Sequence, residues 1–276
     1  MVRSVRLAQL GAATAVLFAV SLSWATIVDL TPARSRPYVG DTRNNSVLGL
    51  AFHLQGMQRV TGEAEERPGP PPFGSVPGPF GEPFTGHGGH PGPFRLANRD
   101  LAGHITWLVP FAVVGLVLIS RTSSVTLPLS RLHQSVLLWS GWFATYAAAF
   151  SFSKSPIHPY YLSLLAPPSA ALVGIGATVL WDAYKKSGFR SFGLVAALTV
   201  TALWQAWTLT YRADSMRWLL PLVLLGAGAS VIALLAARTR RQQPLVARRL
   251  GSASASLGVA SLLICPAAWS ATPVIA

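Results

Sequence analysis

The chain has 276 residues, of which 51% are hydrophobic and only 11% are charged. That balance is typical of a membrane protein. The formal net charge is +13, but the basic residues stand at the ends of apolar runs and aromatic residues do not interleave them, so no nucleic-acid partner is expected. Cys265 is the one cysteine and cannot form an internal disulfide.

Apolar runs divide most of the chain. A helix needs about 20 apolar residues to cross roughly 30 Å of hydrocarbon, and no alternating pattern of barrel strands is visible. The sequence therefore predicts an all-α polytopic transmembrane helix bundle of about seven spans. The last run contains Cys265-Pro266, which interrupts it. The runs lie at 7–28, 101–120, 133–152, 160–181, 192–211, 218–237 and 250–270.

Basic residues predict the orientation, because they collect in short cytoplasmic loops. Only Lys154, Arg212 and Arg217 fall in the short loops of the opposite side. We therefore expect a multi-pass protein of the cell membrane with a cytoplasmic N-terminus and an external C-terminus. The basic residues on the cytoplasmic side are Arg3, Arg6, Arg121, Arg131, Lys185, Lys186, Arg190, Arg238, Arg240, Arg241, Arg248 and Arg249.

The first run, within residues 1–28, has a second interpretation. Arg3 and Arg6 followed by an apolar stretch and Ser23-Trp24-Ala25 also fit a cleaved signal peptide. Cleavage would leave the later topology unchanged, because the segment that follows is external in both interpretations.

Residues 29–100 form the one long hydrophilic segment, which we expect to be an external loop. Its first part, 29–62, has enough interleaved apolar positions for a short amphipathic helix on the membrane surface. Residues 68–94 are rich in Pro and Gly, which predicts a flexible tract. His87 and His90 lie there without a third ligand, so we expect no metal site. Residues 101–276 are then a six-span helical membrane domain.

A cluster of cationic, aromatic and proline residues, Ser153 to Tyr161, lies between two apolar runs. A charge at a membrane edge must be solvated, paired or offered to a ligand, so such groups are candidates for a functional site. The cluster predicts an anionic ligand. The candidate residues are Lys154, His158, Tyr160 and Tyr161.

Several motifs occur in an order that resembles a known family. They are Arg36-Pro37-Tyr38-Val39-Gly40, Asn44-Asn45-Ser46-Val47-Leu48, the Gly/Pro-rich loop, Pro93-Phe94-Arg95-Leu96 and the cluster around Lys154. Together they resemble the ArnT-like and protein-mannosyltransferase-related membrane glycosyltransferases of actinobacterial type. The resemblance covers only the middle and later membrane part of such an enzyme. It implies a GT-C architecture and sugar transfer from a polyprenyl-phosphate carrier to an acceptor on the external face.

That family places a catalytic carboxylate in its first external loop, and no matching acidic motif is found here. Asp29 follows the first span and is a weak candidate for that carboxylate, since its neighbours match a later loop of the family. We therefore expect a truncated or split enzyme. It would bind the carrier lipid and would need an N-terminal catalytic half as partner.

Sugar transfer needs a base for the acceptor and cations for the leaving phosphate. The chain offers candidates for the second task, and tyrosine hydroxyls can also donate to phosphate oxygens. No cofactor is evident, and the sequence leaves a divalent-metal requirement open. The expected partners are the lipid-linked sugar donor and membrane lipid. The candidate phosphate-binding residues are Lys154, His158, Tyr160, Tyr161, Arg36 and Tyr38, with Arg212, Arg217, Asn44 and Asn45 as secondary candidates.

Other interpretations remain open. Lys154 also fits an interface anchor, and the tyrosine pair fits an aromatic belt. Arg212, Asp214 and Arg217 also fit a local exposed ion pair. The main alternative function is a non-catalytic polytopic membrane protein, either transporter-like or binding partners through the Pro-rich loop. No phosphate-binding loop, dinucleotide motif or serine-hydrolase motif is present.

Overall fold

The computed structural model describes residues 2–39, 45–57, 88–154, 157–186, 188–211, 216–240 and 243–275. Over these residues the regular structure is helical and contains no strand. The chain divides into two compact units. The first comprises Met1–Val76 with Ser153–Ser155, and the second comprises Pro77–Phe152 and Pro156–Ala276. An all-helical fold was predicted from the sequence and is confirmed for the described residues.

In the first unit, α1 (Val2–Leu30) is one continuous helix of 29 residues. A short 3₁₀ turn follows at Ala33–Ser35, and a π-helical segment occupies Gly49–Met57. The helix predicted within 29–62 therefore exists, while its place on a membrane surface stays a prediction. The Pro/Gly-rich tract at 68–87 lies outside the described residues.

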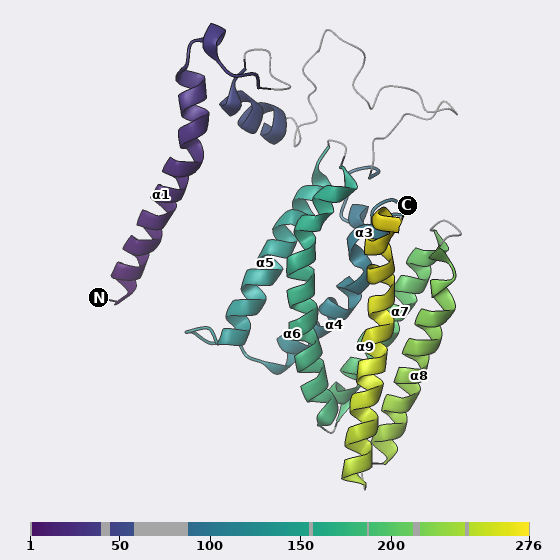
Figure 1. The fold of residues 1–276 in the computed structure, drawn as a ribbon. Coiled ribbons are helices and arrows are strands. Elements are labelled where there is room, and N and C mark those ends of the chain that lie inside the picture. The colour runs from purple at the N-terminus through teal and green to yellow at the C-terminus, as the bar shows by residue number, and fades with distance from the viewer. Residues whose placement is uncertain are drawn as a thin grey trace. The chain divides into compact units, whose positions relative to one another are not determined.

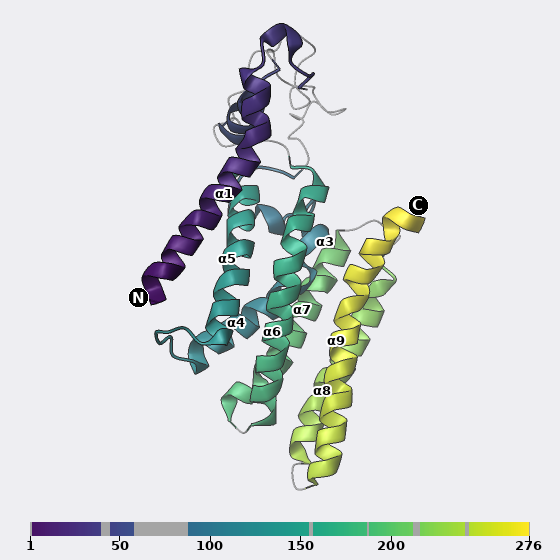
Figure 2. The same ribbon diagram turned by 60° about the vertical axis from the view of Figure 1, so that its left-hand side comes forward.

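The second unit is a bundle of helices that alternate in direction, as Figures 1 and 2 show. One end of it, the aromatic end, holds residues 88–108, 157–165 and 216–219. The opposite end, the basic end, holds residues 121–131, 185–192 and 238–248. The helices are α3 (Ala102–Ile105), α4 (Val109–Thr122), α5 (Arg131–Phe152), α6 (Ala166–Lys185), α7 (Gly193–Thr210), α8 (Leu219–Thr239) and α9 (Pro244–Ile275).

Six helical segments in the described residues are long and apolar enough to cross a membrane. Each of the seven predicted runs falls on a helix, but α5, with its 22 residues, is not among these six. The chain is thus a helical, multi-pass membrane protein, and the predicted count of seven spans is not confirmed. The six segments are Leu7–Leu30, Ala102–Thr122, Pro159–Lys185, Phe189–Thr210, Leu219–Thr239 and Leu245–Ala271.

Small residues allow the helices of the bundle to approach closely. A Cβ atom added to Gly115 of α4 would lie 2.6 Å from the Cα of Gly176 in α6. Gly226 of α8 faces Ser261 of α9, and Gly258 of α9 faces Ser230 of α8, with equally little room for a side chain. Close packing of small residues is a common basis of helix association in membranes. α9 continues through Cys265-Pro266, so the predicted interruption does not occur.

Candidate functional site

Asp29, the weak candidate for a catalytic carboxylate, lies one residue before the end of α1. Its carboxylate accepts hydrogen bonds from Ser46 Oγ (2.7 Å), Val47 N–H (2.8 Å) and Leu48 N–H (3.2 Å). The first N–H groups of a helix have no partner within the helix, and a side-chain oxygen commonly satisfies them. The geometry therefore gives Asp29 a structural role as the cap of the helical segment that begins at Val47.

Arg36, a predicted phosphate ligand, folds back onto the end of α1. Its Nε donates to the carbonyl oxygen of Thr31 (2.8 Å) and its Nη2 to that of Asp29 (2.5 Å). Carbonyls at a helix C-terminus carry partial negative charge and favour a cation. At least two donors of the guanidinium are thus engaged within the first unit.

The other candidates of the first unit differ in their surroundings. The Asn45 side-chain carbonyl accepts a hydrogen bond from Val39 N–H (3.1 Å). Tyr38 is 86% exposed, so its hydroxyl is accessible. Asn44 lies outside the described residues.

His158, Tyr160 and Tyr161 form an aromatic cluster at the aromatic end of the second unit. The His158 and Tyr160 rings stack with centroids 5.3 Å apart, and the Tyr160 and Tyr161 rings meet edge to face at 4.5 Å. Ile157 and Leu162, on either side of the cluster in sequence, are buried and anchor it to the bundle. The structure therefore brings together three of the residues that the sequence singled out.

The remaining cationic candidates are exposed. Lys154 follows the last residue of α5, Phe152, by two positions and groups with the first unit. Arg217 is exposed in the turn that leads into α8, at the aromatic end of the second unit. Arg212 and Asp214 lie outside the described residues, so their predicted ion pair stays a prediction.

Arg95 is a cation at the aromatic end that the sequence analysis placed only within a motif. The side chain is 5% exposed, and its Nη1 donates to the carbonyl oxygen of Phe150 (3.2 Å) near the end of α5. Its Nε donates to the carbonyl oxygen of Gly88 (3.0 Å). Burial lowers the pKa of the Arg95 guanidinium from its ordinary value. Local spacing could not identify Arg95, because the helix end that it binds lies far along the chain.

Residues 98–100 complete this end. Asn98 accepts backbone hydrogen bonds from Asp100 (3.1 Å) and Leu101 (2.9 Å), which fixes the entry into α3. The Arg99 guanidinium lies 4.4 Å from the centre of the Tyr211 ring. Asp100 is exposed and places a carboxylate on the same surface. The sequence analysis did not single out any of these three residues.

The aromatic end thus combines cations, hydroxyl donors and an imidazole at the ends of apolar helices. Such groups can hold a phosphate at the membrane edge while the apolar tail of a lipid stays in the hydrocarbon. The described residues include no cluster of three or more His, Cys, Asp or Glu side chains that could bind a metal.

Comparison with known proteins gives two relatives with nearly equal sequence identity to the chain. The chain is 30% identical to "Putative mannosyltransferase YkcB" of Bacillus subtilis (strain 168), over an alignment that covers 98% of the chain and 47% of the relative. It is 29% identical to "Putative mannosyltransferase YycA" of the same organism, with 94% of the chain and 47% of the relative covered. No family model matches the chain, and no solved structure matches it.

The chain spans about half the length of these curated relatives. The alignment with YkcB extends over 348 positions, more than the 276 residues of the chain, so the relative has additional residues within the aligned region. The predicted resemblance to mannosyltransferase-related membrane proteins is therefore confirmed: the chain is similar over nearly its whole length to two proteins named as mannosyltransferases.

Proposed function

We propose that this chain is part of a membrane glycosyltransferase that transfers a sugar from a polyprenyl-phosphate carrier to an acceptor on the external face. In this proposal the chain supplies the side that binds the lipid-linked phosphate. The observation that carries the proposal is the similarity of nearly the whole chain to two named mannosyltransferases. The apolar helices agree with a lipid-linked donor.

The aromatic end supports a role in phosphate binding. There Tyr160 and Tyr161 supply hydroxyl donors beside the imidazole of His158. The proposal adds the exposed ammonium of Lys154, which belongs to the first unit. When the bond from the sugar to the phosphate breaks, negative charge develops on the phosphate oxygens. Fixed cations and donors at that position lower the barrier. Arg36 and Tyr38 join this set in the proposal.

The base that accepts the acceptor's proton is assigned to a partner. Asp29 already caps a helix with its carboxylate. The relatives contain about as much sequence outside the alignment as inside it. The proposal places the catalytic carboxylate in a segment equivalent to that remaining sequence.

The test uses the full chain in lipid nanodiscs with a photoreactive polyprenyl phosphate. Wild-type protein should capture the probe, with labelled peptides from the Ser153–Tyr161 region. Lys154→Ala should reduce capture about tenfold, equivalent to about 1.4 kcal/mol of binding free energy. Arg131→Ala, at the basic end, is the control and should leave capture unchanged. Equal capture by wild type and Lys154→Ala would contradict a phosphate-binding role of Lys154 and would favour its alternative role as an interface anchor.

A second measurement addresses turnover. When the chain is co-expressed with a segment equivalent to the unaligned part of a relative, membranes should transfer mannose from polyprenyl-phosphate mannose to an acceptor hydroxyl and release polyprenyl phosphate. The Lys154→Ala variant should lower this turnover at least about tenfold. Transfer by the purified chain alone would contradict the assignment of the carboxylate to a partner.

A further inference from the structure

Two cavities adjoin in the bundle, one at its basic end and the other extending from there along the helices. The first has a volume of about 990 Å³ and lies where α6 and α8 end and α9 begins. The second has a volume of about 550 Å³ and lies along α4, α6, α7 and α9. Trp181 and Ser252 line both cavities, so the two cavities share a wall.

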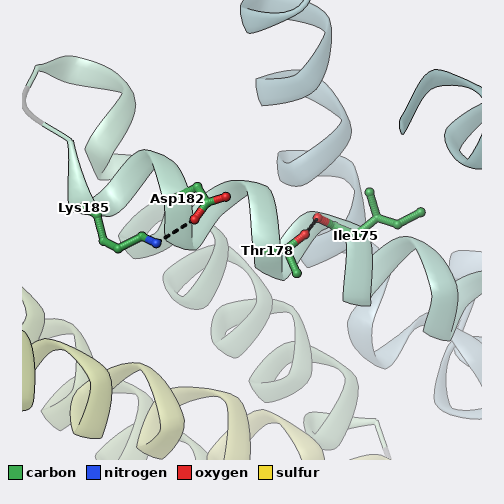
Figure 3. Close-up of polar contacts among 4 residues, drawn as sticks. All are labelled: Ile175, Thr178, Asp182 and Lys185. Atoms are coloured by element: carbon green, nitrogen blue, oxygen red, sulfur yellow. Dashed lines mark hydrogen bonds and ion pairs between the residues drawn. The ribbon is translucent and has the colours of Figure 1, made fainter. Parts of the chain in front are cut away.

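The first cavity is cationic. Lys185, Lys186, Arg238 and Arg248 line it, and no carboxylate is among the described residues of its lining. Beside it, Asp182 forms an ion pair of 2.7 Å with Lys185 on the last turn of α6, as Figure 3 shows. The lining therefore keeps a net positive charge even after this pair is counted.

Arg238 is fixed at this cavity. Its guanidinium lies 3.8 Å from the centre of the Phe192 ring, a favourable cation–π contact. Its Nη1 is buried and has no hydrogen-bond partner among the described residues. A buried donor without an acceptor costs free energy, and an anion in the cavity would lower that cost.

Two aromatic side chains form the wall between the helices. Trp181 and Tyr184 stack with centroids 5.5 Å apart, and the Tyr184 hydroxyl donates to the carbonyl oxygen of Leu234 (2.8 Å). Gly251 of α9 faces them, and a Cβ atom there would lie 3.3 Å from Tyr184 Cε1. The wall is therefore fixed in position rather than built from loose surface side chains.

The second cavity is mainly apolar. Phe111, Ala177, Leu194 and Leu263 are among the residues that line it, and they belong to four different helices. It lies along the candidate membrane spans, whereas the cationic cavity lies where three of those spans end or begin. A headgroup-sized cationic cavity joined to an apolar groove fits an amphiphile with an anionic head.

We propose that these two cavities bind one anionic glycerophospholipid, with its phosphate among Lys185, Lys186, Arg238 and Arg248 and an acyl chain along the apolar groove. Basic cavities between membrane helices are known sites for anionic headgroups. The cationic cavity lies at the opposite end of the bundle from the aromatic cluster, and the proposal does not depend on the proposed transferase function. By the predicted orientation the lipid belongs to the cytoplasmic leaflet.

The test measures binding of phosphatidylglycerol to the purified full chain in a neutral detergent, by native mass spectrometry and by the shift of the unfolding midpoint. We expect saturable binding of phosphatidylglycerol and no comparable binding of phosphatidylcholine. The double variant Lys186→Gln/Arg248→Gln should bind about tenfold more weakly. The matched control Arg240→Gln/Arg249→Gln removes two positive charges from the same end outside the cavity lining, and it should bind as the wild type does.

A second variant tests the apolar groove. Ser256 is exposed and lines the groove, so Ser256→Phe should fill it without disturbing the core and should weaken phosphatidylglycerol binding. The unfolding midpoint without lipid shows whether each variant is folded.

Four outcomes would overturn the proposal. Equal loss in the control variant would mean diffuse attraction to the basic end. Equal binding of phosphatidylcholine would mean that charge is irrelevant. Competition by glycerol phosphate at the same concentration would mean a site for soluble phosphate. Displacement of phosphatidylglycerol by substoichiometric polyprenyl phosphate would mean a site for the carrier lipid.

Discussion

The side-chain amide of Gln205 donates a hydrogen bond of 2.9 Å to the backbone carbonyl oxygen of Leu262. In a regular helix that carbonyl would accept from the residue four positions later, which here is Pro266 and has no N–H. A proline inside a membrane helix is tolerated when a neighbouring helix satisfies the freed carbonyl. Gln205 of α7 therefore explains why α9 continues through Cys265-Pro266.

The same amide nitrogen also donates to the carbonyl oxygen of Trp107 (3.0 Å). Trp107 lies in a 3₁₀ turn, where the expected donor three residues later is Pro110, another residue without an N–H. One fully buried side chain thus joins α7 to two other segments of the bundle.

We predict that Gln205→Leu lowers the free energy of unfolding by about 1–2 kcal/mol. The strongest single interhelical hydrogen bonds in membranes contribute about this much. Adding Pro266→Ala should recover part of the loss, because an alanine at this position can donate its own N–H to the Leu262 carbonyl. Unfolding in mixed micelles of the four proteins in this double-mutant cycle measures the coupling. Additive effects at the two positions would contradict the explanation.

The crossing of α4 and α6 predicts an asymmetric response to alanine. Gly115→Ala should destabilise the bundle by about 1–3 kcal/mol, because the new methyl group meets backbone at 2.6 Å and the helices must separate. Gly176→Ala should be tolerated, since its Cβ would lie 3.5 Å from the Cα of Gly115. Gly174→Ala, with open space around it, is the control on α6. Thermal unfolding in detergent measures how much each of the three variants destabilises the bundle. Equal destabilisation by Gly115→Ala and Gly176→Ala would refute the predicted asymmetry.

Arg95 should contribute to stability more than its exposed neighbour Arg99. Arg95→Met removes the donors to Gly88 and Phe150, and a hydrogen bond from a charged group contributes about 1.5–3 kcal/mol. Arg99→Met removes one exposed contact with the Tyr211 ring, for which about 0.5–1 kcal/mol is expected. Hydrogen exchange of the last turn of α5 should accelerate in the first variant only.

Asp29 offers a test of capping against catalysis. Asp29→Asn keeps a side-chain oxygen that can cap the segment beginning at Val47, whereas Asp29→Ala removes it and should cost about 1 kcal/mol locally. Limited proteolysis after residue 45 should therefore be faster in Asp29→Ala than in Asp29→Asn. If Asp29→Asn abolishes transfer while proteolysis stays as in the wild type, Asp29 is catalytic after all.

The predicted orientation can be read by cysteine labelling. Cys265 is buried, and Cys265→Ala gives a background for single-cysteine variants. We expect Lys154→Cys and Arg36→Cys to react with an impermeant reagent on intact cells, and Arg248→Cys to react only after the membrane is opened. Labelling of Lys154→Cys and Arg36→Cys from opposite sides would contradict both the topology and the proposed phosphate site.

The sequence by itself determined which segments are apolar helices, and six of the seven predicted runs lie in segments long and apolar enough to cross a membrane. Apolar length is a local property, so each of the seven predicted runs could be found without knowing its neighbours. The aromatic cluster at His158–Tyr161 was also readable, because residues close in sequence at a helix end stay close in space. The sequence did not show that the helix continues through Cys265-Pro266, because this continuity depends on the hydrogen bond from Gln205 to the Leu262 carbonyl.

Tertiary structure decided which polar groups meet across the bundle. Arg95 binds the end of a helix 55 residues later in the chain, and the two adjoining cavities combine residues of five helices, α4, α6, α7, α8 and α9. Apolar residues facing lipid and apolar residues facing other helices are nearly equivalent in hydropathy, so the sequence carries little information on helix pairing. Where glycine allows two helices to approach closely, as Gly115 and Gly176 do for α4 and α6, is a property of the packed bundle.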